Sequence, residues 1–523
     1  MGEVFVTNFT AIDWVIVAIY LMLSVLVGIW VNRYIHNVTD YLVGGRASRT
    51  SLNVATYIGT GLGLVTLMYA SIDAFSNGFA YVTLALMGFV VGVILGATGL
   101  VIGPLREMKL LTIPEFFERR YGPRTRIVAG SICALAGILN MGLFPKLGAT
   151  FITYVTGLSE GSGSHELTIN VVTSLLIVAV LLYTVIGGMV SVMLTDYLQF
   201  VVLSIGMGLG VYFCLIHPDL GWNNMVGTLA EHRGEGMFNP IVNENYGWIW
   251  VCFNFVVLFV ASFCWAPEAT RALTARDVAT TRRTFLVGAP GQFIRLGVPA
   301  LWAVAAFCLV AASPALTEHF FPFGLDGEAR HASQAMPLVI GKIVPSGLLG
   351  LLVAGLLAAF MSTHDSYLLC WASVIARDVV NPLTGGALGG QAQIRVTRIG
   401  VVLIGVFLLV WGVWYELPDS VWNYMAVTGT IYLSGAGVAL LGGIYWKRAS
   451  TVGALAAFTG GLVSIIGLFT EQINERLENM GSGFEITSPM LGLFNYIFCA
   501  VLFIAFSLLF PDRRHASSRV PAK

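Results

Sequence analysis

The stretch SGLLGLLVAGLLAAFMSTHDSYLLCWASVIARDV, residues 346–379, carries a row of polar side chains in the middle of a long apolar segment. A membrane-spanning helix needs about 20 mostly apolar residues, and this stretch supplies them around Ser362-Thr363-His364-Asp365-Ser366. A carboxylate at that depth is costly, so it marks a functional site by default. The segment predicts an all-α membrane protein whose function depends on this helix.

Helical spacing gathers part of this row on one face. Four residues lie at positions i, i+3, i+4 and i+7, with Asp365 beside them: Ala359, Ser362, Thr363 and Ser366. Hydroxyls, backbone carbonyls and a carboxylate are hard oxygen ligands, which suit an alkali cation better than a transition metal. The face therefore indicates a cation site, and hydrogen bonding between helices is the alternative.

A second unusual segment, residues 50–72, holds three glycines at alternate positions in the run Gly59-Thr60-Gly61-Leu62-Gly63. Each glycine costs about 1 kcal/mol in a helix interior, so we expect the helix to be weakened or broken there. Transporters build ion and substrate sites from such breaks at membrane depth. Close packing of helices through small residues is the alternative.

The whole chain has the composition of a membrane protein. Of its 523 residues, 57% are hydrophobic and 11% charged, and the mean hydropathy is +0.81, whereas a soluble domain has roughly a quarter of its residues charged. The 28 basic and 28 acidic residues cancel, so no overall field would attract nucleic acid. We expect one transmembrane domain, 1–523, with thirteen spans near residues 12–32, 50–72, 79–104, 127–157, 166–186, 189–216, 246–270, 289–312, 346–379, 396–416, 419–445, 451–470 and 489–510.

Basic residues give these spans an orientation. With the N-terminus outside, 22 of the 28 Lys and Arg residues fall in inside loops or the C-terminal tail and four in outside loops, while Lys146 and Arg295 fall within spans. Cytoplasmic loops carry the Lys/Arg excess, so the sequence predicts a multi-pass plasma-membrane protein, N-terminus outside and C-terminus cytoplasmic. No basic segment precedes the first apolar stretch, which we interpret as a retained span rather than a signal peptide.

Two further charges lie deep in predicted spans. Asp196, in GGMVSVMLTDYLQF (187–200), would need a cation or a polar partner, because burying a lone carboxylate is expensive. Lys146 follows Pro145 inside its span, so it reaches the membrane surface, pairs with a carboxylate of the protein or contacts an anionic substrate. The sequence has no phosphate-binding glycine loop that ends in Lys-Ser or Lys-Thr, and no paired acid and base at a loop mouth. Neither an ATP-driven pump nor an enzyme is expected.

Six motifs, in order along nearly the whole chain, resemble those of the solute:sodium symporter family. They are ATYIGTG (55–61), TIPEFFERRYG (112–122), GGMVSVMLTDYLQ (187–199), RALTARD (271–277), GLLAAFMSTHDSYLL (355–369) and GGIYWKRASTVGA (442–454). The resemblance implies a LeuT-like core of ten helices in two inverted repeats, 48–216 and 246–445, with 12–32 as a peripheral helix and 451–510 as C-terminal helices. The broken helices of such a core would be 50–72 and 246–270, and Pro267 is compatible with an interruption in the second.

The resemblance also implies where sodium binds. One ion would lie between the first and eighth core helices, bound by three backbone carbonyls and two hydroxyls, from Ala55, Ile58, Ala359, Ser362 and Thr363. The last three belong to the helical face that spacing alone indicates. Some members hold a second cation further inside, which here would be bound by Asp196, Asp365 and Ser366. Asp365 stands where the two-sodium pattern has a serine.

The substrate is less well defined than the ion. Sugar-carrying members use a Glu-Gln pair in the broken first helix and a Gln in the tenth, and the corresponding residues here are Gly61, Leu62 and Met425. A sugar would lose most of its hydrogen-bond partners, so sugar transport is disfavoured. We take these three residues, with Thr60 and Lys146, as candidate substrate contacts, and Lys146 favours an anionic solute such as a monocarboxylate.

Together these features predict a sodium-coupled symporter that imports a small organic solute by alternating access, with Na+ as the coupling ion. Sodium would tie the first core helix to the eighth and order the broken segment, so that the substrate site forms with sodium present. Three alternatives stay open: a proton-coupled symporter with Asp365, Asp196 or His364 as proton carrier, a solute sensor without transport, and a membrane enzyme.

Overall fold

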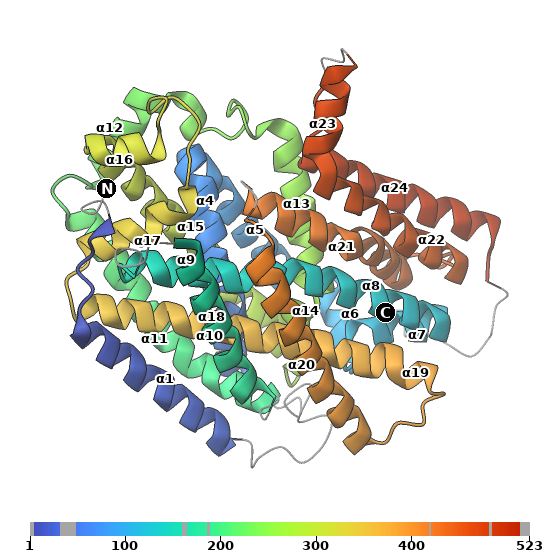
Figure 1. Ribbon diagram of the computed structural model, residues 1–523. Helices are drawn as coiled ribbons and strands as arrows, with labels where there is room; N and C mark the ends of the chain where they lie inside the picture. The colour runs from blue at the N-terminus through green and yellow to red at the C-terminus, as the bar shows by residue number, and fades with distance from the viewer. Residues whose placement is uncertain are drawn as a thin grey trace.

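The computed structural model describes residues 5–31, 49–158, 165–185, 189–417, 420–480 and 484–512, and every regular element in these ranges is a helix. Long apolar helices pack side by side throughout (Figure 1). Eleven helices in the described ranges are long and apolar enough to cross a membrane. Each of the thirteen predicted spans overlaps a helix, whereas the number of crossings and the orientation of the two ends remain predictions.

Two predicted spans are each split into two helices. α3 (Thr50–Gly61) ends at the glycine run, Gly63 is extended with φ −87° and ψ 154°, and α4 (Leu64–Asn77) follows. α13 (Gly247–Cys264) ends before Trp265, which is extended with φ −67° and ψ 116°, and α14 (Ala266–Thr274) follows with a proline in its first turn. The break predicted from the glycines is confirmed, and so is the expected interruption near Pro267.

The element that opened the sequence analysis is α18 (Leu348–Val374), a helix buried along almost all of its length. It packs against α11 (Met189–Ile216), where a Cβ added to Gly355 would lie 3.0 Å from the carbonyl oxygen of Val202. Small residues at such crossings let helix backbones approach closely inside a membrane. The polar row is therefore held inside the helix bundle rather than facing lipid.

The first helix and the last helices lie on opposite flanks of the molecule (Figure 1). α1 (Ala11–Val31) packs on α11 and α18, and Asp13 at its start accepts hydrogen bonds from the backbone N–H groups of Gly347 and Gly350 at 2.7 and 2.6 Å. The carboxylate thereby satisfies N–H groups at the beginning of α18, where a negative charge is favoured. α22 (Thr451–Gly461) and α24 (Ser488–Leu509) pack on α21 (Val421–Tyr445).

The other helices complete the bundle and its loops. They are α5 (Val82–Thr98), α6 (Ile102–Glu107), α7 (Ile113–Tyr121), α8 (Pro123–Asn140), α9 (Phe144–Val155), α10 (His165–Thr184), α12 (Trp222–Arg233), α15 (Val278–Ala311), α16 (Pro314–Phe320), α17 (Ala332–Ile343), α19 (Asn381–Leu383), α20 (Gly390–Trp414) and α23 (Thr470–Asn479). Short 3-10 segments are η4 (Gly78–Tyr81), η5 (Met141–Leu143), η6 (Glu235–Met237) and η8 (Leu462–Phe469), and η7 (Ile375–Val380) is a π-helical turn that continues α18.

A loop helix clamps the end of α18. The segment predicted as a loop helix, 112–122, forms α7, and Thr112 before it donates a hydrogen bond to Asp378 in η7 at 2.9 Å. Arg126 of α8 pairs with the same carboxylate at 2.7 Å and also with Glu118 of α7. Tyr121, at the end of α7, donates to the carbonyl of Ala439 in α21 at 2.6 Å. One short helix thus ties together α8, the end of α18 and α21.

Candidate functional site

The hydroxyl-bearing face of α18 is fully buried. Ala359, Ser362 and Thr363 are all buried, and the Thr363 hydroxyl donates to the Ala359 carbonyl at 3.0 Å. The Ala359 carbonyl and the Thr363 hydroxyl, two of the five predicted sodium ligands, therefore lie side by side. Their oxygen atoms are uncharged and hard, which is the chemistry that an alkali cation prefers.

The break between α3 and α4 lies directly against this face. A Cβ added to Gly63 would fall 2.1 Å from the Thr363 hydroxyl oxygen, so the backbone of the break touches the predicted sodium ligand. α3 ends just before this contact, and the Ile58 carbonyl accepts the backbone N–H of Leu62 at 2.8 Å. The C-terminus of a helix carries a partial negative charge, which favours a cation there. Ala55, the remaining predicted ligand, is buried one turn earlier on α3.

The region predicted for a second cation contains an arginine that the sequence analysis did not place there. Arg271 of α14 is 1% exposed, and its Nη2 donates to the Ser366 hydroxyl at 2.8 Å. Asp365 accepts a hydrogen bond from the Thr184 hydroxyl at 2.5 Å. The side chain of Asp196 lies outside the described part of the structure, although its backbone belongs to α11. A fixed positive charge is thus already in contact with one of the three predicted ligands.

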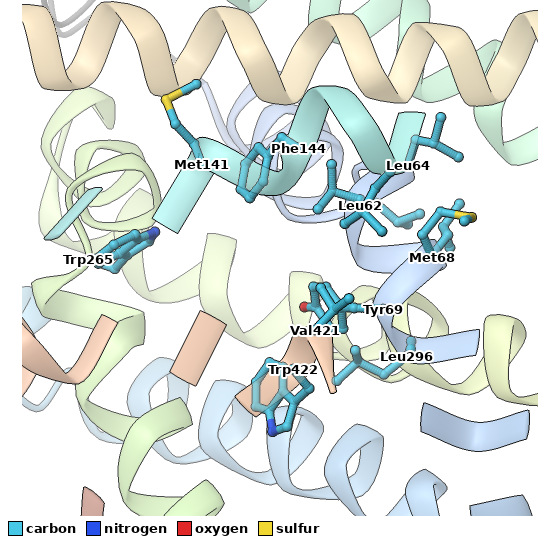
Figure 2. Packing of buried hydrophobic residues seen from close by; sticks show 14 of the residues in the cluster. Leu62, Leu64, Met68, Tyr69, Met141, Phe144, Trp265, Leu296, Val421 and Trp422 are labelled. Carbon is cyan, nitrogen blue, oxygen red and sulfur yellow. The ribbon is translucent and has the colours of Figure 1, made fainter. Parts of the chain in front are cut away.

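A cavity of about 90 Å³ lies beside the two broken helices. Its walls include Trp265 at the second break, Tyr69 of α4, Tyr367 of α18 and Trp422 of α21. Figure 2 shows Tyr69 and Trp422 close together, and their ring centroids are 5.2 Å apart. The Trp265 indole donates to the Tyr367 hydroxyl at 3.0 Å, which joins the second break to the helix that carries the predicted sodium ligands.

One ion pair lines this cavity. Arg295 of α15 and Glu268 in the first turn of α14 meet at 2.9 Å between Nη1 and Oε1. Arg295 also contacts Gln292 Oε1 at 3.3 Å and the Tyr69 hydroxyl at 3.4 Å. An ionisable pair at membrane depth, inside a cavity, marks a binding or transport site.

The predicted substrate contacts divide around this cavity. Met425 lines it, and Gly61 lies behind its ion pair, since a Cβ added to Gly61 would be 3.0 Å from Arg295 Nη1. Leu62 is buried in the hydrophobic core, where Figure 2 places it beside Leu64. Lys146 does not line the cavity, and its Nζ donates to the Tyr415 carbonyl at 2.8 Å. The side chain of Thr60 lies outside the described part.

Sequence reasoning did not assign Glu268 and Arg295 to a site. A signal for Arg295 was present, because it falls with Gln292 inside a predicted span and one helical turn apart. Glu268 gave less warning, because it follows the second break at Trp265-Ala266-Pro267. Nothing in the sequence shows that these two residues, 27 positions apart, face each other.

Comparison with known proteins now identifies the chain. The model of the sodium:solute symporter family matches residues 41–461. The chain belongs to this family. As a sodium:solute symporter it is a multi-pass membrane transporter and not an enzyme, and Na+ is its coupling ion. Its homologues transport small organic solutes.

Its curated relatives differ in their solutes. The chain is 24% identical to the sodium/sialic acid symporter SiaT of Proteus mirabilis, over 90% of this symporter and 91% of that protein. It is 25% identical to the sodium/pantothenate symporter of Haemophilus influenzae (82% and 84% covered) and 24% identical to the human high affinity choline transporter 1 (85% and 75% covered).

Solved structures give the same fold. A Na+-coupled sialic acid symporter in a substrate-bound outward-open state matches with a TM-score of 0.77 at 21% identity, over 96% of this symporter and 99% of that chain. The nucleobase-cation-symport-1 family transporter Mhp1 in a closed conformation matches with a TM-score of 0.53 at 14% identity, over 92% and 97%. The expected LeuT-like, all-α architecture is confirmed.

Proposed function

We propose that this symporter uses one sodium site, at Ala55, Ile58, Ala359, Ser362 and Thr363, to drive import of a small carboxylate-bearing solute through the cavity beside Arg295. The observation that carries the proposal is the double contact of the first break, with Gly63 against Thr363 and Gly61 against Arg295. Only Leu62 separates the glycine that touches a proposed sodium ligand from the glycine that touches the charged group of the cavity. Monocarboxylates belong to this solute class, and neutral sugars do not.

The geometry supports coupling between the two sites. Sodium bound at Thr363 would fix the position of the break through Gly63, and the break in turn supports Arg295 through Gly61. Tyr367 offers a second route, because it follows Thr363 by four residues, about 6 Å along α18, and lines the cavity. A solute would therefore find its contacts in place when sodium is bound.

Sodium supplies the energy for alternating access. In the predicted orientation the ion enters from outside, where it is abundant, and the membrane potential adds about 2.3 kcal/mol per charge per 100 mV. We propose that the two broken helices move relative to α18 as the cavity changes its exposure, since mid-membrane breaks in such carriers form the binding site around which the repeats move. The repeats would be residues 48–216 and 246–445.

The carboxylate is assigned to Arg295 rather than to Lys146. Arg295 lines the cavity and presents a planar guanidinium, which matches a carboxylate with two parallel hydrogen bonds. Lys146 does not line the cavity and donates to the Tyr415 carbonyl instead. The partner that the sequence could not identify for Lys146 is therefore a backbone oxygen within the protein. A sugar remains disfavoured, because the positions that correspond to the sugar-binding side chains of the sugar-carrying members are Gly61, Leu62 and Met425 here, which offer no side-chain hydrogen bonds.

The sequence also predicts a second cation at Asp196, Asp365 and Ser366, and this stays a prediction. The guanidinium of Arg271 on the Ser366 hydroxyl argues against a further sodium there, because two positive charges at contact distance repel each other. We therefore propose that a single sodium accompanies each solute.

The sodium site can be tested without knowing the solute. Purified protein in detergent is titrated with NaCl or KCl at constant ionic strength, and its thermal unfolding midpoint is followed. We expect NaCl alone to raise the midpoint, and we expect Ser362→Ala with Thr363→Ala to raise the half-saturating sodium concentration about tenfold or more, because hydrogen bonds and ion contacts to charged groups are worth about 1.5–3 kcal/mol.

Thr459→Ala is the matched control. Thr459 lies exposed on α22 and bonds only to carbonyls of its own helix in the described structure, so its loss should leave the sodium titration unchanged. Equal stabilisation by NaCl and KCl, or an unchanged titration in the double variant, would show that sodium does not bind at these residues.

A further inference from the structure

Among the described residues that line the cavity, the charges sum to zero. Arg295 and Glu268 come from different helices, and their side chains are 17% and 14% exposed. Both lie in a span or next to one, where an unpaired charge is strongly unfavourable. Any solute that enters must therefore leave both charges with a partner.

Each member of the pair can accept a further partner. A guanidinium has five N–H donors, and Arg295 Nε is buried without an acceptor among the described residues. Glu268 meets Arg295 through Oε1 and has a second carboxylate oxygen. It lies in the first turn of α14, where the helix dipole stabilises its negative charge.

This pairing discriminates between solutes by their charge. A simple monoanion that takes Arg295 competes with Glu268 and leaves that carboxylate without its cation, and a simple cation on Glu268 does the same to Arg295. A solute that pairs with only one member of a buried ion pair leaves the other charge buried without a partner, which is strongly unfavourable. A zwitterion gives each side chain an opposite charge, so neither loses its partner.

The walls of the cavity suit a cationic nitrogen. Trp265, Tyr367, Tyr69 and Trp422 surround the pair with aromatic rings, whose faces attract ammonium groups. The volume of about 90 Å³ corresponds to about six to nine water molecules at about 10–15 Å³ each. The solute is therefore small, with about as many non-hydrogen atoms as an amino acid or a betaine.

We propose that the solute is a small zwitterion, whose carboxylate binds Arg295 and whose cationic nitrogen binds Glu268 within the aromatic walls. This inference rests on the proposed function, which assigns the carboxylate of the solute to Arg295. It adds that the solute carries a cationic nitrogen, which binds Glu268. It narrows the carboxylate-bearing class to molecules that carry both charges.

A panel of matched solutes tests the charge requirement. Glycine betaine is compared with 3,3-dimethylbutyrate, which has the same shape without the positive charge, and with choline, which lacks the carboxylate. Alanine is compared with propionate and ethylamine. Binding to the full-length purified protein is followed by the thermal unfolding midpoint in NaCl and in KCl.

We expect at least one zwitterion to stabilise the protein in NaCl but not in KCl, and to bind about 100-fold more tightly than either matched single-charge analogue. If 3,3-dimethylbutyrate or propionate stabilises it and no zwitterion does, the inference fails and the proposed function stands. If no solute with a carboxylate stabilises it in NaCl, or if stabilisation is equal in KCl, the inference and the proposed function both fail.

A substitution at the pair separates recognition from folding. Glu268→Gln removes the site for the nitrogen and frees Arg295, so zwitterion binding should weaken about 100-fold while the matched carboxylate binds more tightly than to the parent protein. Glu231→Gln, an exposed change on α12, should leave both affinities unchanged. A structural defect would weaken both classes together and shift the sodium titration, and that result, or an unchanged ratio between the two classes, would overturn the proposal.

Discussion

Gly63 is the residue at which the proposed sodium site depends on the absence of a side chain. A Cβ there would fall 2.1 Å from the Thr363 hydroxyl oxygen and 3.0 Å from the Thr363 Cβ, so α3 and α18 would have to separate. We expect Gly63→Ala to raise the half-saturating sodium concentration more than tenfold, because the ligands on the two helices move apart. The NaCl titration of the unfolding midpoint measures this change.

Gly208→Ala is the control for that prediction. Gly208 lies in α11, and a Cβ added there meets nothing within 4 Å, so its sodium titration should match that of the parent protein. Replacing a helix-interior glycine by alanine should stabilise the fold by up to about 1 kcal/mol. A normal sodium titration in Gly63→Ala would mean that the break does not contact the ion site.

Single residues also show how far sequence reasoning reached. Ala359, Ser362 and Thr363 were placed on one face because helical spacing alone decides which residues share a face. Arg295 and Glu268 could not be paired in this way, since their contact depends on how α14 packs against α15. The partner of Lys146 was equally hidden, because the Tyr415 carbonyl is 269 positions away.

At the scale of elements, α7 and η7 fix the end of α18, the helix that carries three of the proposed sodium ligands. Asp378 is buried, accepts from Thr112 and pairs with Arg126 at 2.7 Å. We expect Asp378→Asn to destabilise the protein by about 3–5 kcal/mol, because it leaves the Arg126 guanidinium buried with less opposing charge. Thermal or denaturant unfolding in detergent measures the loss.

An exposed carboxylate gives the comparison for Asp378→Asn. Asp219→Asn makes the same change from carboxylate to amide at a side chain that is 70% exposed, and it should shift the free energy of unfolding by less than about 1 kcal/mol. The double variant Arg126→Gln with Asp378→Asn should be less destabilised than the sum of the two single variants, since they share one interaction. Additive losses would show that the pair does not hold α8 to η7, the turn that ends α18.

The elements themselves followed from local chemistry to different degrees. Glycines weaken a helix wherever they occur, so the run at 59–63 located the first break without any tertiary information. The second break lies at Trp265, a residue that carries no such signal, and Pro267 indicated only its neighbourhood. The position of Arg271 on Ser366 depends on that break, because α14 turns its side chain toward α18.

At the scale of the molecule, the two breaks and α18 bring the proposed sodium ligands close to the cavity. Binding linkage then requires that sodium raises solute affinity by the same factor by which the solute raises sodium affinity. Tyr367 connects the two sites, since it lies on α18 one turn from Thr363, lines the cavity and accepts the Trp265 indole N–H at 3.0 Å. Both effects, of sodium on solute affinity and of solute on sodium affinity, can be measured on the same protein with a solute of the panel that binds.

We expect Tyr367→Phe to lower this coupling factor about threefold to tenfold, because losing one neutral hydrogen bond is worth about 0.5–1.5 kcal/mol. The sodium titration without solute should stay unchanged, since Thr363 and Gly63 are untouched. Tyr197→Phe, at an exposed position of α11, should leave the coupling factor as it is. If the coupling factor is unchanged in Tyr367→Phe, the coupling does not run through Tyr367. It would then run through the contacts of Gly63 with Thr363 and of Gly61 with Arg295. In that case the Gly63→Ala variant would lose the coupling as well as the sodium affinity.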